Sequence, residues 1–374
     1  MDLSYTETQD MLRDTLSRFL ADSYGFEARQ AMLARTEGRD PGIWRALSQE
    51  LGLTSAPFAE EYGGMGGGAL ENLIVMQELG KVIAIEPWLS TVVLGGEALC
   101  SVGGAVAAEC IPAIIAGDCT IAFAYAEPQG RYDLAYIQTS AKADGSGYVL
   151  NGHKGVVYDA PWASHLLVTA RTGGSQRERA GVELFLIDAN AKGVTRRDYP
   201  TVDGSRASEV YFENVAVPGD ALLPGGIDLI ERVVDAGTAA ICAEAAGIAG
   251  QMVAQTVEYT KQRKQFGQPI AKFQVLQHRM SDMFMESEQI ASMALMAALK
   301  LDGAADARKA DISLAKAKVA RSLQFVGQNA VQTHGGIGIT MELAIGHYFK
   351  RATMIEGQFG SADHHLERYE ALAF

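Results

Sequence analysis

The segment QRKQFGQP, residues 262–269, brings together residue types that could hold a nucleotide-like ligand. Arg263 is followed by Phe266 and, further on, by Gln274. An arginine fork pairs well with a pyrophosphate, and an aromatic side chain can lie against a flat ring. The pattern therefore suits a dinucleotide cofactor. A solvated basic helix end that complements the helix dipole would give the same pattern, so both interpretations stay open.

A second segment, QTHGGIGIT, spans residues 332–340. Gln332 stands at an expected helix end and is followed by Gly335 and Gly336. The missing side chains of two glycines let backbone amides approach a ligand. Glycine is also the usual residue of a helix C-cap, which is the structural alternative.

A catalytic base at neutral pH could be a carboxylate, and residues 354–365, MIEGQFGSADHH, contain two places to look for one. Glu356 is followed by Gly357, whereas Phe359 has a similar neighbour in Gly360 but carries no acid. The adjacent pair His364 and His365 would point in different directions on a helix. No third Cys, His or carboxylate shows metal spacing with the pair, so we expect no metal site.

Composition limits the class of protein. The 374 residues allow two or three domains, and 48% hydrophobic residues can build a substantial core. The net charge of -13 disfavours binding to nucleic acid and to anionic membranes. The polar, acidic start MDLSYTETQD is unlike a signal peptide, so we expect a cytoplasmic protein with reduced thiols. The four cysteines lack CxxC or metal spacing: Cys100, Cys110, Cys119 and Cys242.

The hydrophobic period changes twice along the chain. Residues 1–115 have helical periodicity, with Met11, Leu12, Leu16, Phe19 and Leu20 expected on one face of a helix that follows Thr6. Residues 116–222 read as strands, including a hairpin around Asp144-Gly145. Residues 223–374 return to a helical period, with many small residues that let helices approach closely. The sequence therefore predicts an α+β protein, mostly α, with three domains at these limits.

Taken together, short signatures along nearly the whole chain resemble the acyl-CoA dehydrogenase family. They are EEYGG, AEP (126–128), NGHK (151–154), FENVAVP (212–218), RKQFG (263–267) and QTHGGIG (332–338). The resemblance implies an N-terminal helical domain, a central small β-barrel and a C-terminal four-helix bundle, with one FAD per protomer of a tetramer. In such enzymes a carboxylate removes the α-proton of an acyl-CoA thioester while the flavin accepts the β-hydride. The implied electron acceptor is an electron-transfer flavoprotein.

The resemblance also implies a set of cofactor-binding positions. Arg263 and Phe266 would hold the FAD of a neighbouring subunit. The other positions would lie along the isoalloxazine, the pyrophosphate and the adenine end of the cofactor: Tyr125, Ala126, Val156, Val157, Gln274, Gln332, Gly335, Gly336 and Ser361.

The position implied for the catalytic base holds no acid. The family's Glu-Gly pair, counted from the double glycine, falls on Phe359-Gly360. Glu356 stands three residues earlier, which is about 10 Å in an extended segment and too far for proton transfer. A second location used in the family falls on Gly237, and Glu244 follows seven residues later on the same helix face. Glu244 and Glu356 are therefore the alternative bases.

The resulting prediction is an FAD-dependent acyl-CoA dehydrogenase that acts as a subunit without the usual base in an α2β2 heterotetramer. Such a chain would be similar to the small subunits of bacterial heterotetramers that act on pimeloyl-type or steroid side-chain CoA thioesters, in lipid or steroid catabolism. Two alternatives stay open. One is a self-sufficient homotetramer that uses Glu244 or Glu356, and the other is a flavin-free structural homologue.

Overall fold

The protein is described by a computed structural model that covers residues 4–35 and 38–373. The chain forms two compact units. The bundle unit comprises Met1–Ala34, Ala69–Ala84 and Thr238–Phe374, and the sheet unit comprises Arg35–Gly68 and Ile85–Gly237. Each is described by itself. The N-terminal helices contribute to both units, and the domain limits predicted at residues 115 and 222 stay predictions.

The bundle unit begins with α1 (Glu7–Ser23), α2 (Phe26–Leu33) and α4 (Ala69–Val82). The expected N-cap of α1 is confirmed, because the Thr6 hydroxyl accepts a hydrogen bond from the Gln9 backbone N–H and the Gln9 side chain accepts one from the Thr6 backbone N–H. Leu16 and Leu20 are buried as expected. Met11 was wrongly assigned to the apolar face, since 64% of it is exposed.

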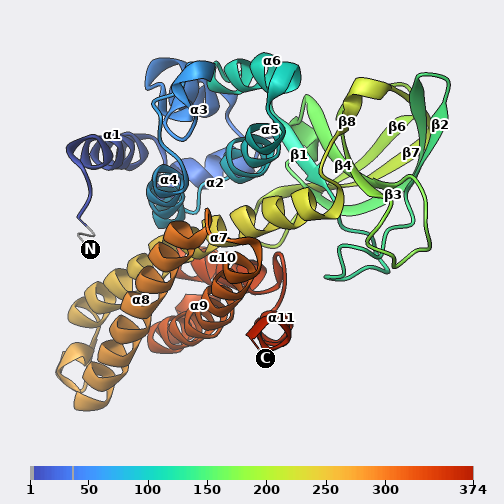
Figure 1. Ribbon diagram of the computed structural model, residues 1–374. Coiled ribbons are helices and arrows are strands. Elements are labelled where there is room, and N and C mark those ends of the chain that lie inside the picture. The colour runs from blue at the N-terminus through green and yellow to red at the C-terminus, as the bar shows by residue number, and fades with distance from the viewer. Residues whose placement is uncertain (1–3, 36–37, 374) are drawn as a thin grey trace. The chain divides into compact units, whose positions relative to one another are not determined.

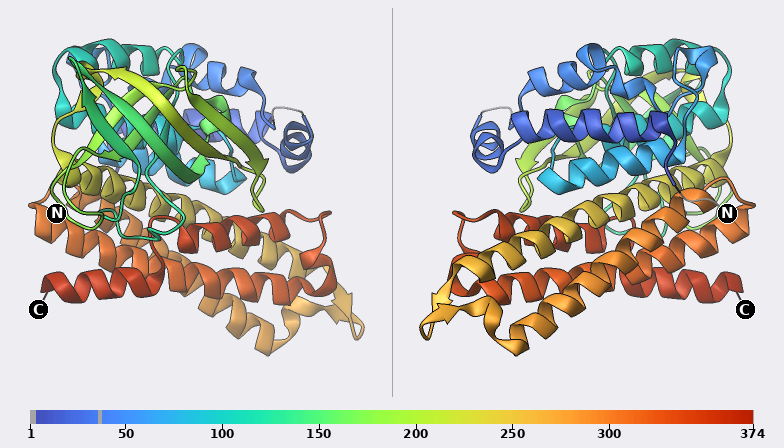
Figure 2. Two further views of the ribbon diagram at one scale, coloured as in Figure 1. Left: turned by 90° about the vertical axis from the view of Figure 1, so that its right-hand side faces the viewer. Right: turned by 90° about the vertical axis from the view of Figure 1, so that its left-hand side faces the viewer.

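Long helices make up the rest of the bundle unit (Figure 1). They are the larger, C-terminal part of α7 (Gly226–Gln262), followed by α8 (Gln274–Lys300), α9 (Ala305–His334), α10 (Ala344–Gly357) and α11 (Ala362–Ala373). Helices α8, α10 and α11 all pack against α9, and Figure 2 shows α8 and α9 side by side. The C-terminal helical bundle is thus confirmed. A short hairpin of β9 (Lys264–Gln265) and β10 (Gln268–Pro269) joins α7 to α8.

Small residues bring α4 and α7 into close contact, as the sequence predicts for α7. A Cβ added to Gly247 would lie 2.0 Å from the Gln77 carbonyl oxygen. A Cβ added to Gly80 would lie 2.3 Å from the Glu244 carbonyl oxygen. No side chain fits at either position, so the two helix backbones touch directly.

The sheet unit is built on an eight-stranded sheet with the order β6-β7-β3-β2-β4-β5-β8, and β1 pairs with β4. The predicted hairpin is confirmed, because Asp144 pairs with Gly147 across the Asp144-Gly145 turn. The strands are β1 (Ile121–Ala124), β2 (Ser140–Asp144), β3 (Gly147–Tyr158), β4 (His165–Arg171), β5 (Val182–Asp188), β6 (Val194–Pro200), β7 (Arg206–Pro218) and β8 (Leu222–Leu223).

The predicted barrel is not closed. Within the described part of the chain, β6 pairs only with β7 and β8 pairs only with β5, so each is an edge strand. The β8 strand has only two residues, which gives it too few backbone groups to bridge to the opposite edge. The core of the sheet unit lies on the inner face of this curved sheet and includes Leu150, Phe185 and Val210.

Helical segments complete the sheet unit: α3 (Pro41–Arg45), the π-helical turn Trp88–Gly95, α5 (Gly96–Val102), α6 (Gly104–Ile115) and the first turns of α7. The apolar stretch 91–117 forms helices, in which Leu99 and Ile111 are fully enclosed. Among the described residues, one helix, Gly226–Gln262, is long and apolar enough to cross a membrane, and 94% of its most apolar window is buried.

Candidate functional site

A buried ion pair anchors the segment that carries Tyr125 and Ala126. Strand β3 directs Lys154 into the sheet unit, where its ammonium lies 2.7 Å from Glu127 Oε1 and 2.8 Å from Thr169 Oγ1. Both charged side chains are almost completely enclosed. A buried charge is tolerated only when it is paired and hydrogen-bonded, and here both conditions are met. The sequence motifs contained both residues, but their pairing was not predicted.

The same carboxylate holds the end of the loop between β1 and β2. Glu127 accepts hydrogen bonds from the backbone N–H groups of Gln138, at 2.8 Å, and Thr139, at 3.0 Å. Burial alone would raise the pKa of Glu127, but the Lys154 ammonium and these donors lower it to about 2. The carboxylate is therefore ionised at neutral pH and fixes the loop that follows Tyr125.

Arg171, at the end of β4, was missed by the sequence reasoning although it is a charge within an apolar strand. Its guanidinium donates to the carbonyl oxygens of Ala135, at 2.6 Å, and Ile137, at 3.2 Å, in the β1–β2 loop. It also donates to carbonyl oxygens of the β4–β5 loop, including Ala180 at 3.1 Å. One buried side chain thus fixes two loops of the sheet unit.

Four positions that the resemblance places along the isoalloxazine come together in the sheet unit: Tyr125, Ala126, Val156 and Val157. The Ala126 carbonyl oxygen accepts a hydrogen bond from Gly155 N–H at 2.9 Å, which places residues 125–126 beside Val156. Val156 has a φ of 51° at a shift in the β3–β7 register, and 46% of it is exposed. Val157 is buried in the core. The bulge therefore turns Val156 outward, as bulges commonly do at functional sites.

The hairpin between α7 and α8 presents an aromatic side chain. Phe266 and Gly267 form its two-residue turn with φ values of 51° and 78°. A left-handed conformation is costly for a bulky residue, and Phe266 is nevertheless 90% exposed. Its ring makes an edge contact with Phe273 at 6.0 Å. Arg263 and Gln274 flank this turn and are also exposed.

Tyr259 links this hairpin to the double glycine at the end of α9. Its backbone carbonyl accepts from Arg263 N–H at 2.8 Å, and its hydroxyl donates to the His334 carbonyl at 3.3 Å. Its ring also stacks on His334 at 4.3 Å. The structure therefore brings Arg263 and Gly335 to the same end of the bundle unit.

The glycines themselves form a helix cap. Gly335 has a φ of 68°, and its N–H donates to the carbonyl oxygens of Gln332 and Val331. The C-cap interpretation is thus confirmed, and the Gly335 amide is not available to a ligand. A Cβ added to Gly335 or Gly336 would meet no described atom within 4 Å. The surface beside these glycines and the exposed Gln332 is open.

The turn between α10 and α11 contains the position implied for the base. Phe359 is 6% exposed and has a φ of 60°. The fully buried Lys316, a residue that the sequence reasoning missed, donates to the carbonyl oxygens of Glu356 at 2.9 Å and Gly360 at 2.7 Å. These two bonds bracket Phe359. Ser361 closes the turn, since its carbonyl accepts from His365 N–H and its hydroxyl from His364 N–H.

The two alternative carboxylates have different surroundings. Glu244 is buried, and its two oxygens each accept from Arg351 at 2.6 Å, so Glu244 is part of an internal ion pair. Glu356 is half-buried in the last turn of α10. The segment from Glu356 to Phe359 is a helix end followed by a turn, so the separation expected for an extended segment does not apply.

The described residues contain no group of three His, Cys, Asp or Glu side chains that could hold a metal ion. Burial and the neighbouring Lys316 ammonium lower the pKa of His365 to about 2, which keeps this imidazole neutral. Its ring packs against Gly360, so it supports the turn.

Three family models match successive parts of the chain. The N-terminal, middle and C-terminal domain models of acyl-CoA dehydrogenase match residues 6–118, 122–215 and 225–370. Among curated relatives, the probable acyl-CoA dehydrogenase YngJ of Bacillus subtilis is 29% identical over 372 residues, covering 97% of each chain. The short-chain specific acyl-CoA dehydrogenase of Megasphaera elsdenii is 30% identical, covering 92% of this chain and 94% of the relative.

Solved structures share the fold. A variant of the Tcur3481–Tcur3483 steroid ACAD is 28% identical with a TM-score of 0.89, covering 98% of each chain. The ChsE4–ChsE5 complex from Mycobacterium tuberculosis is 25% identical with a TM-score of 0.90, covering 99% of this chain and 98% of that chain. The FAD complex of PigA, at 23% identity and a TM-score of 0.90, has the same fold and covers the same shares.

Proposed function

The chain belongs to the acyl-CoA dehydrogenase family, and from this premise we propose that it is an FAD-binding subunit whose homologous partner supplies the catalytic carboxylate. The single observation that carries this proposal is Phe359. An aromatic ring occupies the position implied for the base, in a turn fixed on both sides by Lys316. The substrate class is an acyl-CoA thioester that undergoes α,β-desaturation.

FAD is the cofactor of this family, and when bound it supplies the hydride acceptor. The residues present fit such a group. Val156 is turned outward beside Ala126 in the sheet unit, where a flat ring could lie. In the bundle unit, Phe266 is exposed at the tip of the hairpin. Arg263 lies at the same end of the unit as Gly335, beside which the surface is open. We assign Ala126, Val156, Arg263 and Phe266 to cofactor contact, and the open surface beside Gly335 to the space that the cofactor crosses.

Removal of the substrate α-proton needs a base within hydrogen-bonding reach. Phe359 has no group that accepts a proton. Both oxygens of Glu244 are held by Arg351, and removing that carboxylate from its partner would leave a buried charge uncompensated. Glu356 lies three residues before the implied position, within the last turn of α10. We therefore assign the base to another subunit.

Exposed apolar side chains of the bundle unit support such a partner, because contact with another subunit would bury them. They lie on α8 and in the segment after α9: Val275, Phe284, Met285, Leu299, Ile337, Ile339 and Met341. The likeness to the ChsE4–ChsE5 complex and to the steroid ACAD favours a homologous partner, an α2β2 assembly and a steroid-type or other lipid substrate. We further propose an electron-transfer flavoprotein as acceptor and a cytoplasmic location.

The decisive experiment is an anaerobic titration of the purified chain with a panel of acyl-CoA thioesters while the flavin absorbance is recorded. We expect the isolated chain to carry flavin and to show no bleaching. Addition of a homologous partner that has the family's Glu-Gly pair should restore bleaching. Prompt bleaching of the isolated chain would instead establish a self-sufficient enzyme, and absence of flavin would establish a structural homologue.

A further inference from the structure

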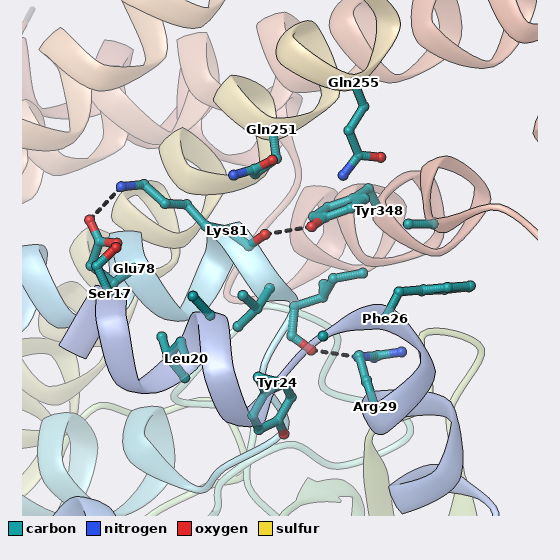
Figure 3. Close-up of a pocket in the computed structure, with 15 residues that line it drawn as sticks. Ser17, Leu20, Tyr24, Phe26, Arg29, Glu78, Lys81, Gln251, Gln255 and Tyr348 are labelled. Atoms are coloured by element: carbon teal, nitrogen blue, oxygen red, sulfur yellow. Dashed lines mark hydrogen bonds and ion pairs between the residues drawn. The ribbon is translucent and has the colours of Figure 1, made fainter. Parts of the chain in front are cut away.

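We propose that a cavity in the bundle unit binds a small amphiphile with an uncharged hydroxyl or carboxamide head group. The cavity has a volume of about 300 Å³ and lies among α1, α2, α4, α7 and α10 (Figure 3). Within the described residues, the positions assigned above to FAD do not line it. It is therefore a separate site from the one that the family resemblance implies.

One corner of the cavity carries a nearly buried carboxylate. Glu78, on α4, is 3% exposed and accepts one hydrogen bond, from Lys81 Nζ at 2.5 Å. No other donor within residues 4–35 and 38–373 reaches this carboxylate. A carboxylate oxygen can accept up to two hydrogen bonds, so Glu78 retains acceptor capacity. The Lys81 side chain is partly exposed and keeps two further N–H donors.

A carboxamide from another helix lines the same cavity. Gln251, on α7, is half-buried, and Figure 3 shows its side chain directed down from α7 into the space between the helices. In the part of the chain that the structure describes, its carboxamide has no hydrogen-bonding partner. It therefore offers both a donor and an acceptor. A ligand that covers this half-buried carboxamide displaces the water bonded to it. A ligand that replaces those hydrogen bonds is therefore favoured over one that does not.

The rest of the cavity has apolar walls and further polar side chains, among them Arg29 and Gln255. Leu20, Val82 and Ile83 line the walls. At the far end, Arg29 donates from Nε to the Ile83 carbonyl at 2.7 Å. The Tyr348 hydroxyl donates to the Lys81 carbonyl. A ligand would therefore place its polar head at the Glu78 corner and an apolar body along the walls.

The charges at the corner decide which head group fits. Glu78 and Lys81 neutralise each other at short range, so an anionic head would be attracted by one and repelled by the other, as would a cationic head. An uncharged head with one donor and one acceptor satisfies Glu78 and Gln251 without that conflict. At about 30 Å³ per water-sized group, the cavity holds roughly ten such groups. This is room for a head and a body of roughly six carbons.

A matched panel tests the proposal on the full chain. Hexanamide, hexanoate and hexylammonium have the same body and differ in the charge of the head. We expect hexanamide to bind saturably by calorimetry, about tenfold tighter than either charged analogue. Tightest binding of hexanoate, driven by Arg29, would overturn the proposal. So would the absence of saturable hexanamide binding.

Two variants locate the site. Gln251→Ala removes one hydrogen-bonding group and should weaken hexanamide binding about two- to ten-fold. Gln328→Ala changes an exposed glutamine of α9 outside the cavity and should leave binding unchanged. Circular dichroism confirms that both variants fold. Equal binding by the Gln251→Ala variant and the parent chain would place hexanamide elsewhere and refute the assignment.

Discussion

The ammonium of Lys316 lies 2.7 Å from the carbonyl oxygen of Gly360, the residue that follows Phe359. A second bond from the same ammonium reaches the Glu356 carbonyl on the other side of the turn. The backbone on both sides of Phe359 is therefore held by hydrogen bonds from Lys316. A side chain with different chemistry at this position would be presented by the same backbone.

Phe359→Glu should install the missing base. Because Lys316 fixes the turn, the new carboxylate should occupy the position implied for proton removal, and flavin bleaching by an acyl-CoA should accelerate about 100-fold or more. Stopped-flow absorbance of the isolated chain measures the rate. Phe359→Gln is the matched control, since it has a similar size but accepts no proton. Equal rates for the two variants would show that the position does not face the substrate.

Phe266→Ala should weaken flavin retention about two- to ten-fold, because one aromatic contact with the cofactor is lost. Phe266 is 90% exposed, so the free energy of unfolding of the protomer should change by less than about 0.5 kcal/mol. Flavin fluorescence during dilution measures retention, and urea titration measures stability. Phe266→Tyr keeps the ring and should behave like the parent. A loss of stability without a loss of flavin would argue for a structural role.

The Glu127–Lys154 pair should make stability depend on acid pH. The folded-state pKa of Glu127 is about 2, below its usual 4.5, so its contribution is present above pH 4.5 and is lost as the pH falls toward 2. The full contribution is about 3 kcal/mol. Urea unfolding between pH 5 and pH 3 measures the slope.

In the double variant Glu127→Gln/Lys154→Met this part of the pH dependence should disappear. The exposed Glu213→Gln is the control, and its slope should match that of the parent chain. An unchanged slope in the double variant would mean that other carboxylates cause the acid sensitivity.

Gly247→Ala should destabilise the bundle unit by about 1–3 kcal/mol, because its Cβ would lie 2.0 Å from the Gln77 carbonyl oxygen and the helices would have to separate. Gly250 lies on the same helix, but a Cβ added to Gly250 would meet no described atom within 4 Å. That variant should gain about 0.5–1 kcal/mol from the higher helix propensity of alanine. Thermal unfolding measures whether Gly247→Ala lowers the stability and Gly250→Ala raises it. Destabilisation of equal size in both would show that helix packing is not the cause.

The sequence by itself determined the features that depend on neighbouring residues. The Thr6 cap, the hairpin at Asp144-Gly145 and the cap at Gly335 follow from local backbone preferences. The family followed from several short signatures in the right order, and counting from the double glycine gave the prediction that Phe359 stands at the base position. Each of these needed only residues that are close along the chain.

The tertiary structure decided the contacts between residues that are far apart in sequence. Lys316 and Gly360 are separated by 44 positions, and Glu244 and Arg351 by 107. Nothing in the local pattern distinguishes Lys316 or Arg351 from an exposed basic residue, and Met11 lies on a periodic apolar stripe although it is exposed. Closure of the sheet likewise depends on whether β6 and β8 meet, which strand patterns leave open. Pairing and burial of this kind depend on how helices and strands pack against one another. The order of residues along a single helix or strand does not predict that packing.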